Sequence, residues 1–425
     1  MKKTLTRRQF AKSLGVGAAA LTVSTGVIGQ AKPHVVVVGG GAGGATVARQ
    51  LALSSKSAVD VTLVENSKTY TSCFFSNLYL GGIRDFNSIT HSYDKLANDY
   101  KINVVNGYAT EVDRSAKVVK LQDGTSLNYD RLVLSPGIDL VYDSVPGYSE
   151  EAANTAPHAW QAGPQTELLK AKLDKLENGD NVIMVAPPNP YRCPPGPYER
   201  VSMMAHLFKT RGMTDSTITI LDPKPKFSKQ GLFSAGWERH YPGVIEWLGP
   251  DIHGGILGVD AAAGTVETDF DTFEAQLLNI IPQQRAGAIV HKAGLVDETG
   301  YCQIHGESMR SVVDDNVFVI GDASVAGDMP KSGFSANSQA KVAVMQILAD
   351  VLQTDTFPAV FANICWSLIG TDDGVKVGAI YSPVDGKIAS TSSFISDGDE
   401  DDSTRKATYE QSLGWYEAIT KDMFG

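Results

Sequence analysis

The residues most able to do redox chemistry are the four cysteines of this 425-residue chain. They are Cys73, Cys193, Cys302 and Cys365. None belongs to a CxxC or CxxCH pattern, which argues against a zinc ribbon, an iron–sulfur cluster and covalent haem c. We therefore predict no metal site and no haem on this chain. Each cysteine can be a small buried hydrophobe, and four cysteines allow three disulfide connectivities, all of which stay open at this point.

A glycine-rich turn near the start of the chain predicts a dinucleotide site. Gly39, Gly41 and Gly44 form a GxGxxG pattern. A valine-rich strand is predicted before it, at 34–38, and a helix after it, whose N-terminal amides can bind a pyrophosphate. Glu65 ends the next predicted strand about 20 residues on, where an acid can accept hydrogen bonds from ribose hydroxyls.

A second α/β stretch begins near residue 150 but lacks the loop that would bind a second nucleotide. The strand predicted at 181–185 runs into a proline-rich segment, 186–197, which contains Cys193. Proline has no amide hydrogen and a fixed φ, so this turn is unsuited to cradling a phosphate. The pattern predicts a Rossmann-like domain whose NAD(P)H site has been lost.

A later segment predicts contacts to a flavin. The strand predicted at 316–320 is followed by Gly321 and Asp322, and a carboxylate there suits the ribityl chain of a flavin. Lys331, Ser332 and Gly333 then open a predicted helix, whose N-terminus could stabilise negative charge on a reduced flavin.

Composition limits the class of protein and its partners. Hydrophobic residues make up 43% of the chain and charged residues 20%, which is typical of a globular protein. The net charge is −11, and removal of the five positive charges in residues 1–31 would leave −16. Such a surface predicts no nucleic-acid partner and favours a basic protein.

The N-terminus predicts export. Arg7 and Arg8 precede Phe10 and a weakly apolar run at 14–28, as in a twin-arginine signal cleaved near residue 31. An uncleaved anchor or a basic amphipathic tail is the alternative. Since no other stretch reaches 18 apolar residues, we predict a periplasmic protein without integral membrane contact.

These segments together resemble the flavoprotein subunit of flavocytochrome c sulfide dehydrogenase, within the glutathione-reductase-like flavoproteins that include sulfide:quinone oxidoreductases. The resemblance spans the chain after the signal, and its most specific segments are 73–77, 157–160, 191–200, 281–287 and 330–333. It implies an α/β fold, with two Rossmann-like domains of the glutathione-reductase type and a smaller C-terminal α/β domain.

The expected domain boundaries follow from this resemblance. They are 1–31 for the signal peptide, 32–149 and 276–350 for the two parts of the FAD-binding domain, 150–275 for the degenerate nucleotide-binding-like domain, and 351–425 for a C-terminal interface domain.

The resemblance also implies the chemistry of individual residues. FAD would be bound covalently through Cys73, and Cys193 and Cys365 would form a redox disulfide beside it. Glu199 would lie near that disulfide and handle protons. His158 is either a proton relay or a structural histidine.

The implied function is periplasmic oxidation of hydrosulfide through the disulfide and FAD, with electrons passed to a cytochrome c subunit in a heterodimer. One alternative is an enzyme of the sulfide:quinone oxidoreductase type. A second is an NAD(P)H-dependent disulfide reductase, which the missing loop disfavours. A third is a flavin electron-transfer subunit that does not itself oxidise sulfide.

Overall fold

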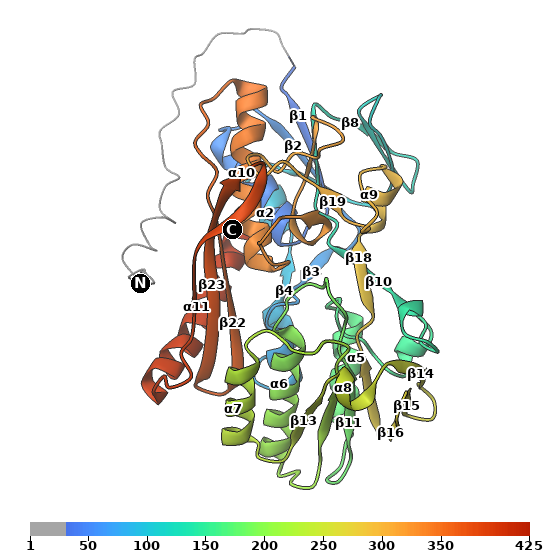
Figure 1. Ribbon diagram of the computed structural model, residues 1–425. Helices are drawn as coiled ribbons and strands as arrows, with labels where there is room; N and C mark the ends of the chain where they lie inside the picture. Colours follow the sequence, from blue (N-terminus) through green and yellow to red (C-terminus); the bar gives the residue numbers. More distant parts are fainter. Residues whose placement is uncertain (1–30) are drawn as a thin grey trace.

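The computed structural model describes residues 31–425. Figure 1 shows two α/β units placed one above the other, with a third unit at their side. Arg7 and Arg8 of the predicted export signal lie outside the described residues. Among residues 31–425, no helix has the length and apolar character needed to cross a membrane.

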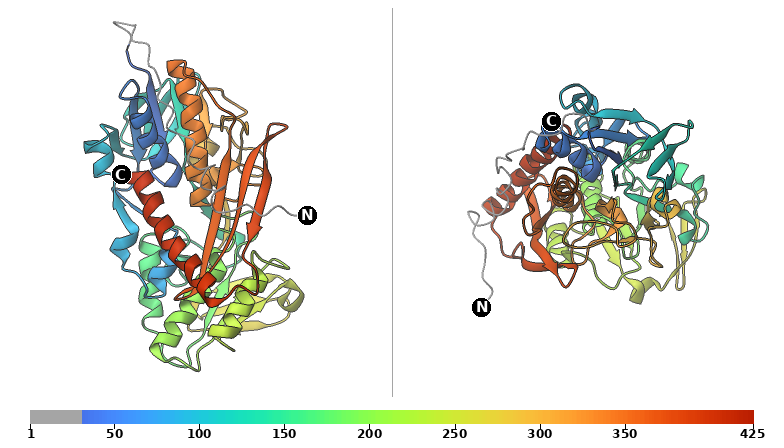
Figure 2. Two further views of the ribbon diagram at one scale, coloured as in Figure 1. Left: turned by 90° about the vertical axis from the view of Figure 1, so that its left-hand side faces the viewer. Right: turned by 90° about the horizontal axis from the view of Figure 1, so that it is seen from above.

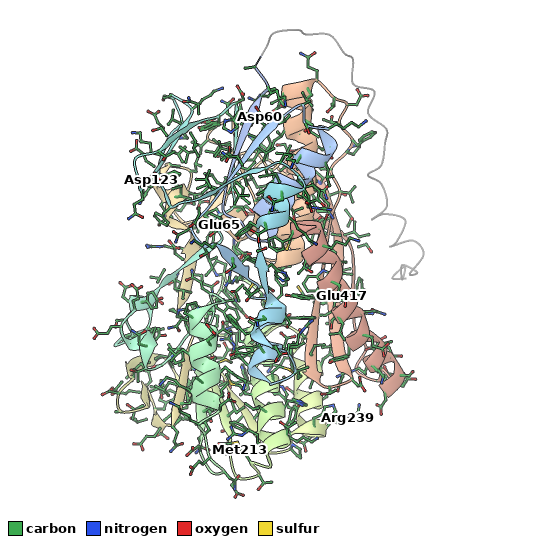
Figure 3. The ribbon with its side chains drawn as sticks, turned by 180° about the vertical axis from the view of Figure 1, so that it is seen from behind. Asp60, Glu65, Asp123, Met213, Arg239 and Glu417 are labelled. Carbon is green, nitrogen blue, oxygen red and sulfur yellow. The ribbon has the colours of Figure 1, made fainter. Side chains whose placement is uncertain are left out.

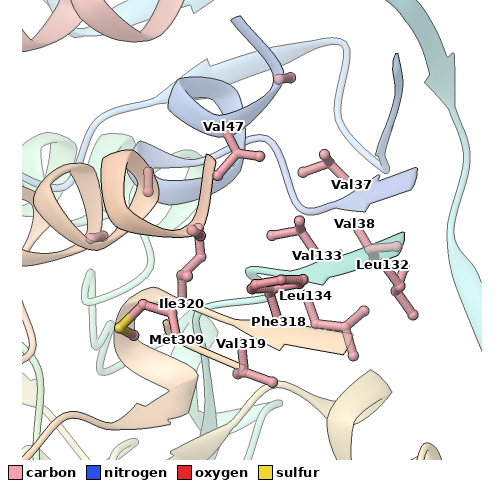
Figure 4. Packing of buried hydrophobic residues seen from close by; sticks show 14 of the residues in the cluster. Val37, Val38, Val47, Leu132, Val133, Leu134, Met309, Phe318, Val319 and Ile320 are labelled. Carbon is pink, nitrogen blue, oxygen red and sulfur yellow. The ribbon is translucent and has the colours of Figure 1, made fainter. Parts of the chain in front are cut away.

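The first unit is built on a five-stranded parallel sheet with the order β20-β9-β1-β2-β5. Its strands are β1 (His34–Val38), β2 (Asp60–Glu65), β5 (Asn103–Asn106), β9 (Arg131–Leu134) and β20 (Val317–Val319). Four consecutive valines of β1 are buried, as the β-branched residues of a central parallel strand should be. Figure 4 shows Val37 and Val38 in one buried cluster with Leu134 of the adjacent strand β9 and Phe318 of β20 beyond it.

Helix α2 (Ala42–Ser54) connects β1 to β2, and α10 (Gly333–Leu352) packs against α2. Figure 3 shows Asp60 and Glu65 at opposite ends of β2, with Glu65 at the end that faces the middle of the molecule. The carboxyl ends of the parallel strands therefore point toward the second unit, which is where α/β sheets open their ligand crevices.

The second unit repeats this architecture with a four-stranded parallel sheet, in the order β13-β12-β11-β17. Its strands are β11 (Val182–Val185), β12 (Ile218–Leu221), β13 (Ile245–Leu248) and β17 (Leu277–Ile280), and its helices are α5 (Pro164–Leu173), α6 (Gly196–Arg211), α7 (Gln230–His240) and α8 (Pro250–His253). Because β17 pairs with β11, this sheet extends a few residues beyond the boundary predicted at residue 275.

An antiparallel ribbon lies between the two units. It pairs β10 (Ile138–Val141) with β18 (Gln283–Ala286). The chain thus leaves the first unit through one strand of this ribbon and returns through the other.

The third unit is an antiparallel sheet of β22 (Phe361–Gly370), β23 (Asp373–Val384) and β24 (Lys387–Ile395), followed by the long helix α11 (Asp402–Phe424). Figure 2 shows α11 crossing this sheet, and the helix also packs against α2. Strand β22 contacts α10 of the first unit and both α6 and α7 of the second. The C-terminal unit therefore carries Cys365 to the junction of the other two, and the predicted α/β architecture is confirmed.

The remaining elements are short. They are β3 (Thr69–Thr71), α3 (Ser76–Leu80), β4 (Thr90–Ser92), α4 (Asp94–Asn98), β6 (Ala109–Asp113), β7 (Val118–Leu121), β8 (Ser126–Asn128), β14 (Ile256–Asp260), β15 (Thr265–Thr268), β16 (Thr272–Glu274), α9 (Ala288–Lys292), β19 (Cys302–Gln303) and β21 (Ser324–Val325).

Candidate functional site

A cavity of about 460 Å³ lies where the three units meet. Most of the residues that the sequence predicts for the site line it: Gly39, Gly41, Glu65, Cys73, Cys193, Glu199, Asp322, Ser332, Gly333 and Cys365. The fold thus gathers into one place groups that lie far apart in the sequence. Gly44 and Lys331 are not part of the lining.

The glycine turn lines the cavity without side chains, and side chains would not fit at two of its positions. Gly39 has a φ of +99°, and a Cβ on it would stand 2.2 Å from the carbonyl oxygen of Ser135. A Cβ on Gly44 would stand 1.8 Å from the carbonyl oxygen of Gly39. Gly44 therefore serves the close packing of α2 against the turn, while Gly41 stands at the N-cap of α2.

The carboxylate of Glu65 is held at the rim of this turn. Its Oε2 accepts a hydrogen bond of 2.6 Å from the amide of Gly40, and its Oε1 accepts one of 3.0 Å from the amide of Ser67. Each carboxylate oxygen has a second lone pair free for a ribose hydroxyl. The carboxylate is therefore available for the ribose contact that the sequence predicts.

Several buried polar atoms in the cavity wall have no partner among the described residues. They include Oδ1 of Asp322 and the indole nitrogens of Trp160 and Trp366. A buried donor or acceptor without a partner is costly, so such atoms indicate a polar ligand. FAD, with its ribityl hydroxyls and ring heteroatoms, fits a wall of this kind.

The N-terminus of α10 opens on the same cavity. Ser332 caps the helix, since its Oγ accepts a hydrogen bond of 3.0 Å from the amide of Ser335. A Cβ on Gly333 would lie 2.6 Å from the ring of Phe74, so glycine lets the chain pass close to that ring. The positive end of this helix can stabilise an anionic flavin edge, as the sequence predicts.

Lys331 is placed differently from the prediction. Its ammonium donates hydrogen bonds of 2.8 Å to the carbonyl oxygens of Asp322 and Ser324 and lies over the ring of Tyr301. The side chain thus braces the turn behind the cavity instead of facing it. Burial lowers the pKa of this ammonium to about 8.

Cys73 lies in the cavity wall just before α3. Its carbonyl oxygen accepts a hydrogen bond of 2.6 Å from the hydroxyl of Ser76, and Ser72 donates to the carbonyl oxygen of Phe74. These bonds hold a short loop with the thiol beside the candidate flavin site. A thioether between Cys73 and FAD stays a prediction.

Cys193 and Cys365 line the same cavity, and both are thiols in the structure. Cys193 has a φ of +55°, and its amide donates a hydrogen bond of 2.7 Å to the carbonyl oxygen of Lys331. Burial raises the pKa of each thiol, and for Cys193 the neighbouring negative charge of Cys365 adds to the effect. The structure brings the two residues together, and the disulfide between them stays a prediction.

Glu199 lies in the first turn of α6 and connects three elements. Its Oε1 accepts a hydrogen bond of 2.9 Å from the amide of Leu368 in β22, and its Oε2 accepts one of 2.8 Å from Asn77 in α3. Burial raises the pKa of this carboxyl above its ordinary value. A carboxyl held in this way lies in the same cavity wall as the two cysteines and is a candidate to exchange protons there.

Sequence reasoning missed two buried cations. Lys229 donates hydrogen bonds to the carbonyl oxygen of Cys365 (3.0 Å) and to Oγ of Ser367 (2.7 Å). Burial lowers the pKa of its ammonium to about 8. In the sequence Lys229 follows other lysines in a polar segment, which gave no signal of burial.

The second missed cation, Arg200, is only 2% exposed. Its guanidinium donates to the carbonyl oxygens of His158 (2.8 Å) and Ala159 (2.6 Å) and lies over the ring of Trp160. Burial lowers its pKa to about 9. Arg200 therefore fixes the segment that forms one wall of the cavity.

His158 is a structural histidine. Its Nδ1 accepts a hydrogen bond of 2.9 Å from the amide of Trp160, and burial lowers the pKa of the ring to about 3. A ring that stays neutral at physiological pH is a poor proton relay. Cys302 is fully buried in β19 and lies outside the cavity lining.

In the second unit, the position that corresponds to Glu65 is enclosed. Asp222 directly follows β12 and is fully buried. Its oxygens accept hydrogen bonds from Tyr198 (2.6 Å), Trp247 (3.0 Å) and the amide of Lys224 (3.0 Å), and the Lys224 ammonium lies 2.7 Å away. That ammonium also donates to the carbonyl oxygen of Pro187. No carboxylate oxygen is left for a ribose.

Comparison with known proteins agrees with this arrangement. Residues 166–282 match the central part of the sulfide dehydrogenase [flavocytochrome c] flavoprotein chain, and residues 358–424 match the flavin-binding part of flavocytochrome c sulphide dehydrogenase. Residues 33–176 match the pyridine nucleotide-disulphide oxidoreductases. The resemblance proposed from the sequence is confirmed.

Individual relatives belong to a neighbouring group. The chain is 25% identical over 338 residues to the mitochondrial sulfide:quinone oxidoreductase of Dictyostelium discoideum, covering 74% of this chain and 70% of that one. It is 23% identical over 373 residues to the sulfide-quinone reductase of Aquifex aeolicus, covering 80% and 82%. The solved structure of the sulfide:quinone oxidoreductase from Aquifex aeolicus superimposes with a TM-score of 0.72 at 17% identity, covering 92% of each chain.

Proposed function

We propose that this chain, an FAD-dependent, sulfide-oxidising flavoprotein of the flavocytochrome c sulfide dehydrogenase and sulfide:quinone oxidoreductase type, oxidises hydrosulfide through a Cys193–Cys365 disulfide and delivers the electrons to a cytochrome c subunit. One observation carries the proposal. Both cysteines and Glu199 line the same cavity as the glycine turn, Glu65 and Asp322.

The residues of the first unit would hold FAD. The amides at the start of α2 would bind the pyrophosphate, Glu65 the ribose and Asp322 the ribityl chain, with the N-terminus of α10 near the ring. When bound, FAD supplies an acceptor that takes two electrons from a thiol and can return them one at a time.

The disulfide would supply the sulfur chemistry. Hydrosulfide attacks one sulfur of the Cys193–Cys365 bond, which breaks to leave a persulfide on one cysteine and a thiolate on the other. Glu199, with its raised pKa, takes up or returns the proton of the incoming sulfur. The ammonium of Lys229 donates a hydrogen bond to the carbonyl oxygen of Cys365 and would stabilise a thiolate on that cysteine.

We also propose that Cys73 binds FAD covalently. Acid precipitation of the wild-type protein should then leave the flavin with the polypeptide, and precipitation of Cys73→Ala should release it. Complete release of FAD from the wild-type protein would rule out the covalent bond.

The electron acceptor would be a haem on another polypeptide, since this sequence has no CxxCH motif. The acidic charge of the chain suits a basic cytochrome. The quinone-linked relatives make a quinone the second candidate acceptor. Reoxidation of the sulfide-reduced protein by cytochrome c but not by a soluble quinone favours the first, and the reverse result favours the second.

We propose that export through the twin-arginine route places this chemistry in the periplasm. Replacement of Arg7 and Arg8 with lysine should then retain the precursor in the cytoplasm. Normal periplasmic accumulation of that variant would contradict the proposal.

The decisive test of the proposed function compares three cysteine variants. Cys193→Ser and Cys365→Ser should each abolish flavin reduction by sulfide under anaerobic conditions while FAD stays bound. Cys302→Ser is the matched control, because Cys302 is buried outside the cavity lining, and this variant should react like the wild-type protein. Reduction of Cys365→Ser by sulfide at the wild-type rate would reject the mechanism. A wild-type flavin that sulfide does not reduce would instead favour a flavin electron-transfer subunit.

A further inference from the structure

A second cavity, of about 240 Å³, adjoins Cys365. Its lining and that of the flavin cavity have one described residue in common, which is Cys365 itself. The second cavity is bounded by the segment after Cys193, by the segment before α10 and by β22, β23 and β24. Cys365 therefore forms part of the wall between two spaces that are lined by different residues.

The lining of the second cavity is mostly apolar. Its polar side chains are hydroxyls, one amide and one carboxylate, and none of the described residues that form it is basic. Its members are Pro194, Pro195, Ser228, Asp328, Pro330, Asn363, Cys365, Val377, Gly378, Ala379, Tyr381, Ser390 and Ser393. The carboxylate of Asp328 accepts a hydrogen bond of 3.0 Å from the amide of Ser390. A nucleotide or another large anion would find no cation here.

The size of the cavity points to a small occupant. Its volume is below the roughly 300 Å³ at which pockets for organic ligands begin. It is nevertheless large enough for several molecules of the size of water, which occupies about 30 Å³ in the liquid. Hydrogen sulfide and short sulfur species are of that size, and neutral hydrogen sulfide needs no cation in the lining.

Two side chains that line the second cavity also interact with the side chain of Cys365. Asn363 donates a hydrogen bond of 3.3 Å to Sγ of Cys365. Tyr381 lies close enough that its pKa is raised to about 12, first by burial and then by the charges of Cys365 and Asp328. Ser390 and Ser393 are exposed, so the cavity has its mouth on the β24 side of the sheet.

We propose that this second cavity is the passage through which inorganic sulfur reaches Cys365. The proposal rests on the proposed function, which supplies both the substrate and the reactive cysteine. The flavin cavity holds the glycine turn, Glu65 and Asp322, and is reserved for the cofactor. The passage reaches Cys365 through a separate cavity, which is lined by other residues. Sulfide therefore does not have to compete with FAD for space.

Ser393→Trp tests the passage by placing a large ring at its mouth. Thr391→Trp is the matched control, because Thr391 is exposed on the same strand but does not line the cavity. Both variants should keep their FAD and the wild-type rate of reduction by dithionite. Reduction by sulfide should slow about tenfold in Ser393→Trp and stay at the wild-type rate in Thr391→Trp, because only the first ring narrows the route.

Alkylation gives a second readout that does not depend on turnover. After reduction of the protein with a dithiol, the rate at which iodoacetamide labels Cys365 is measured by mass spectrometry of its peptide. Labelling of Cys365 should slow in Ser393→Trp and not in Thr391→Trp. Labelling of Cys365 and reduction by sulfide both at wild-type rates in Ser393→Trp would overturn the passage. Failure of sulfide to reduce even the wild-type flavin would instead overturn the proposed function.

Discussion

The two α/β units begin with the same topology and use it for different chemistry. In each, a buried parallel strand leads through a turn into a helix and then to a second parallel strand, as β1-α2-β2 and as β11-α6-β12. The first turn is made of glycines and presents backbone amides. The second is made of prolines and presents a thiol, Cys193, while its helix provides Glu199.

The acidic residues after β2 and β12 show the same contrast. Glu65 lines the open cavity and has lone pairs free, whereas Asp222 is buried under Tyr198, Trp247 and Lys224. The second unit therefore differs from the first in more than the glycines of its turn. The ribose position has been filled with a hydrogen-bonded core, and the turn has become available for sulfur chemistry.

The largest expected effect comes from breaking the first turn. Gly44→Ala should prevent FAD binding and leave little folded protein, because the new Cβ has no room beside the carbonyl oxygen of Gly39. The measurement is the FAD content and thermal unfolding of the purified variant.

Gly231→Ala is the control for that variant, because Gly231 is also helical and has open space around it. Its stability should stay within about 1 kcal/mol of the wild-type value. A Gly44→Ala protein with full FAD content would show that the close packing of this turn is dispensable.

The enclosed acid of the second unit should matter for stability and not for the cofactor. Asp222→Ala leaves the buried ammonium of Lys224 without its carboxylate, which should cost roughly 3–5 kcal/mol of unfolding free energy. Denaturant unfolding and FAD content are measured together. An Asp222→Ala protein that loses FAD while its stability is unchanged would contradict the division of roles between the units.

A smaller effect is expected from Lys229 as the pH is changed. Burial lowers the pKa of its ammonium from an ordinary value of 10.5 to about 8. Between these two values the unfolded chain binds more protons than the folded one, so the contribution of Lys229 to stability rises with pH. The stability of the wild-type protein relative to Lys229→Met should therefore increase from pH 8 to pH 10, by at most about 1.4 kcal/mol per pH unit.

Denaturant unfolding of both proteins across that range measures this difference. A difference between wild type and Lys229→Met that is independent of pH would show that the ammonium titrates at its ordinary value in the folded protein.

The sequence predicted those parts of the fold and site that are determined by neighbouring residues in the chain. The glycine turn, the valine strand and the proline segment each constrain their own backbone, so the two Rossmann-like units could be inferred from the order of residues alone. The loss of the NAD(P)H site stays a prediction. The resemblance added Cys193, Cys365 and Glu199, which the fold then placed in one cavity.

What the sequence could not show depends on contacts between distant segments. The burial of Arg200 and Lys229 follows from the backbone oxygens that accept their hydrogen bonds in the folded chain, and those oxygens come from distant segments. Lys331 was assigned to the cofactor because it adjoins Ser332, but its side chain turns back to the carbonyls of Asp322 and Ser324. Neighbouring positions in a loop can face opposite sides, and local pattern does not distinguish them.

The most direct test of the contrast between the two units is anaerobic titration of the purified wild-type protein, first with NADH and then with sulfide, followed by the absorbance of the flavin. If the second unit has exchanged nucleotide binding for thiol chemistry, NADH should leave the flavin oxidised and sulfide should bleach it stoichiometrically. Rapid stoichiometric bleaching by NADH, with no response to sulfide, would contradict the account.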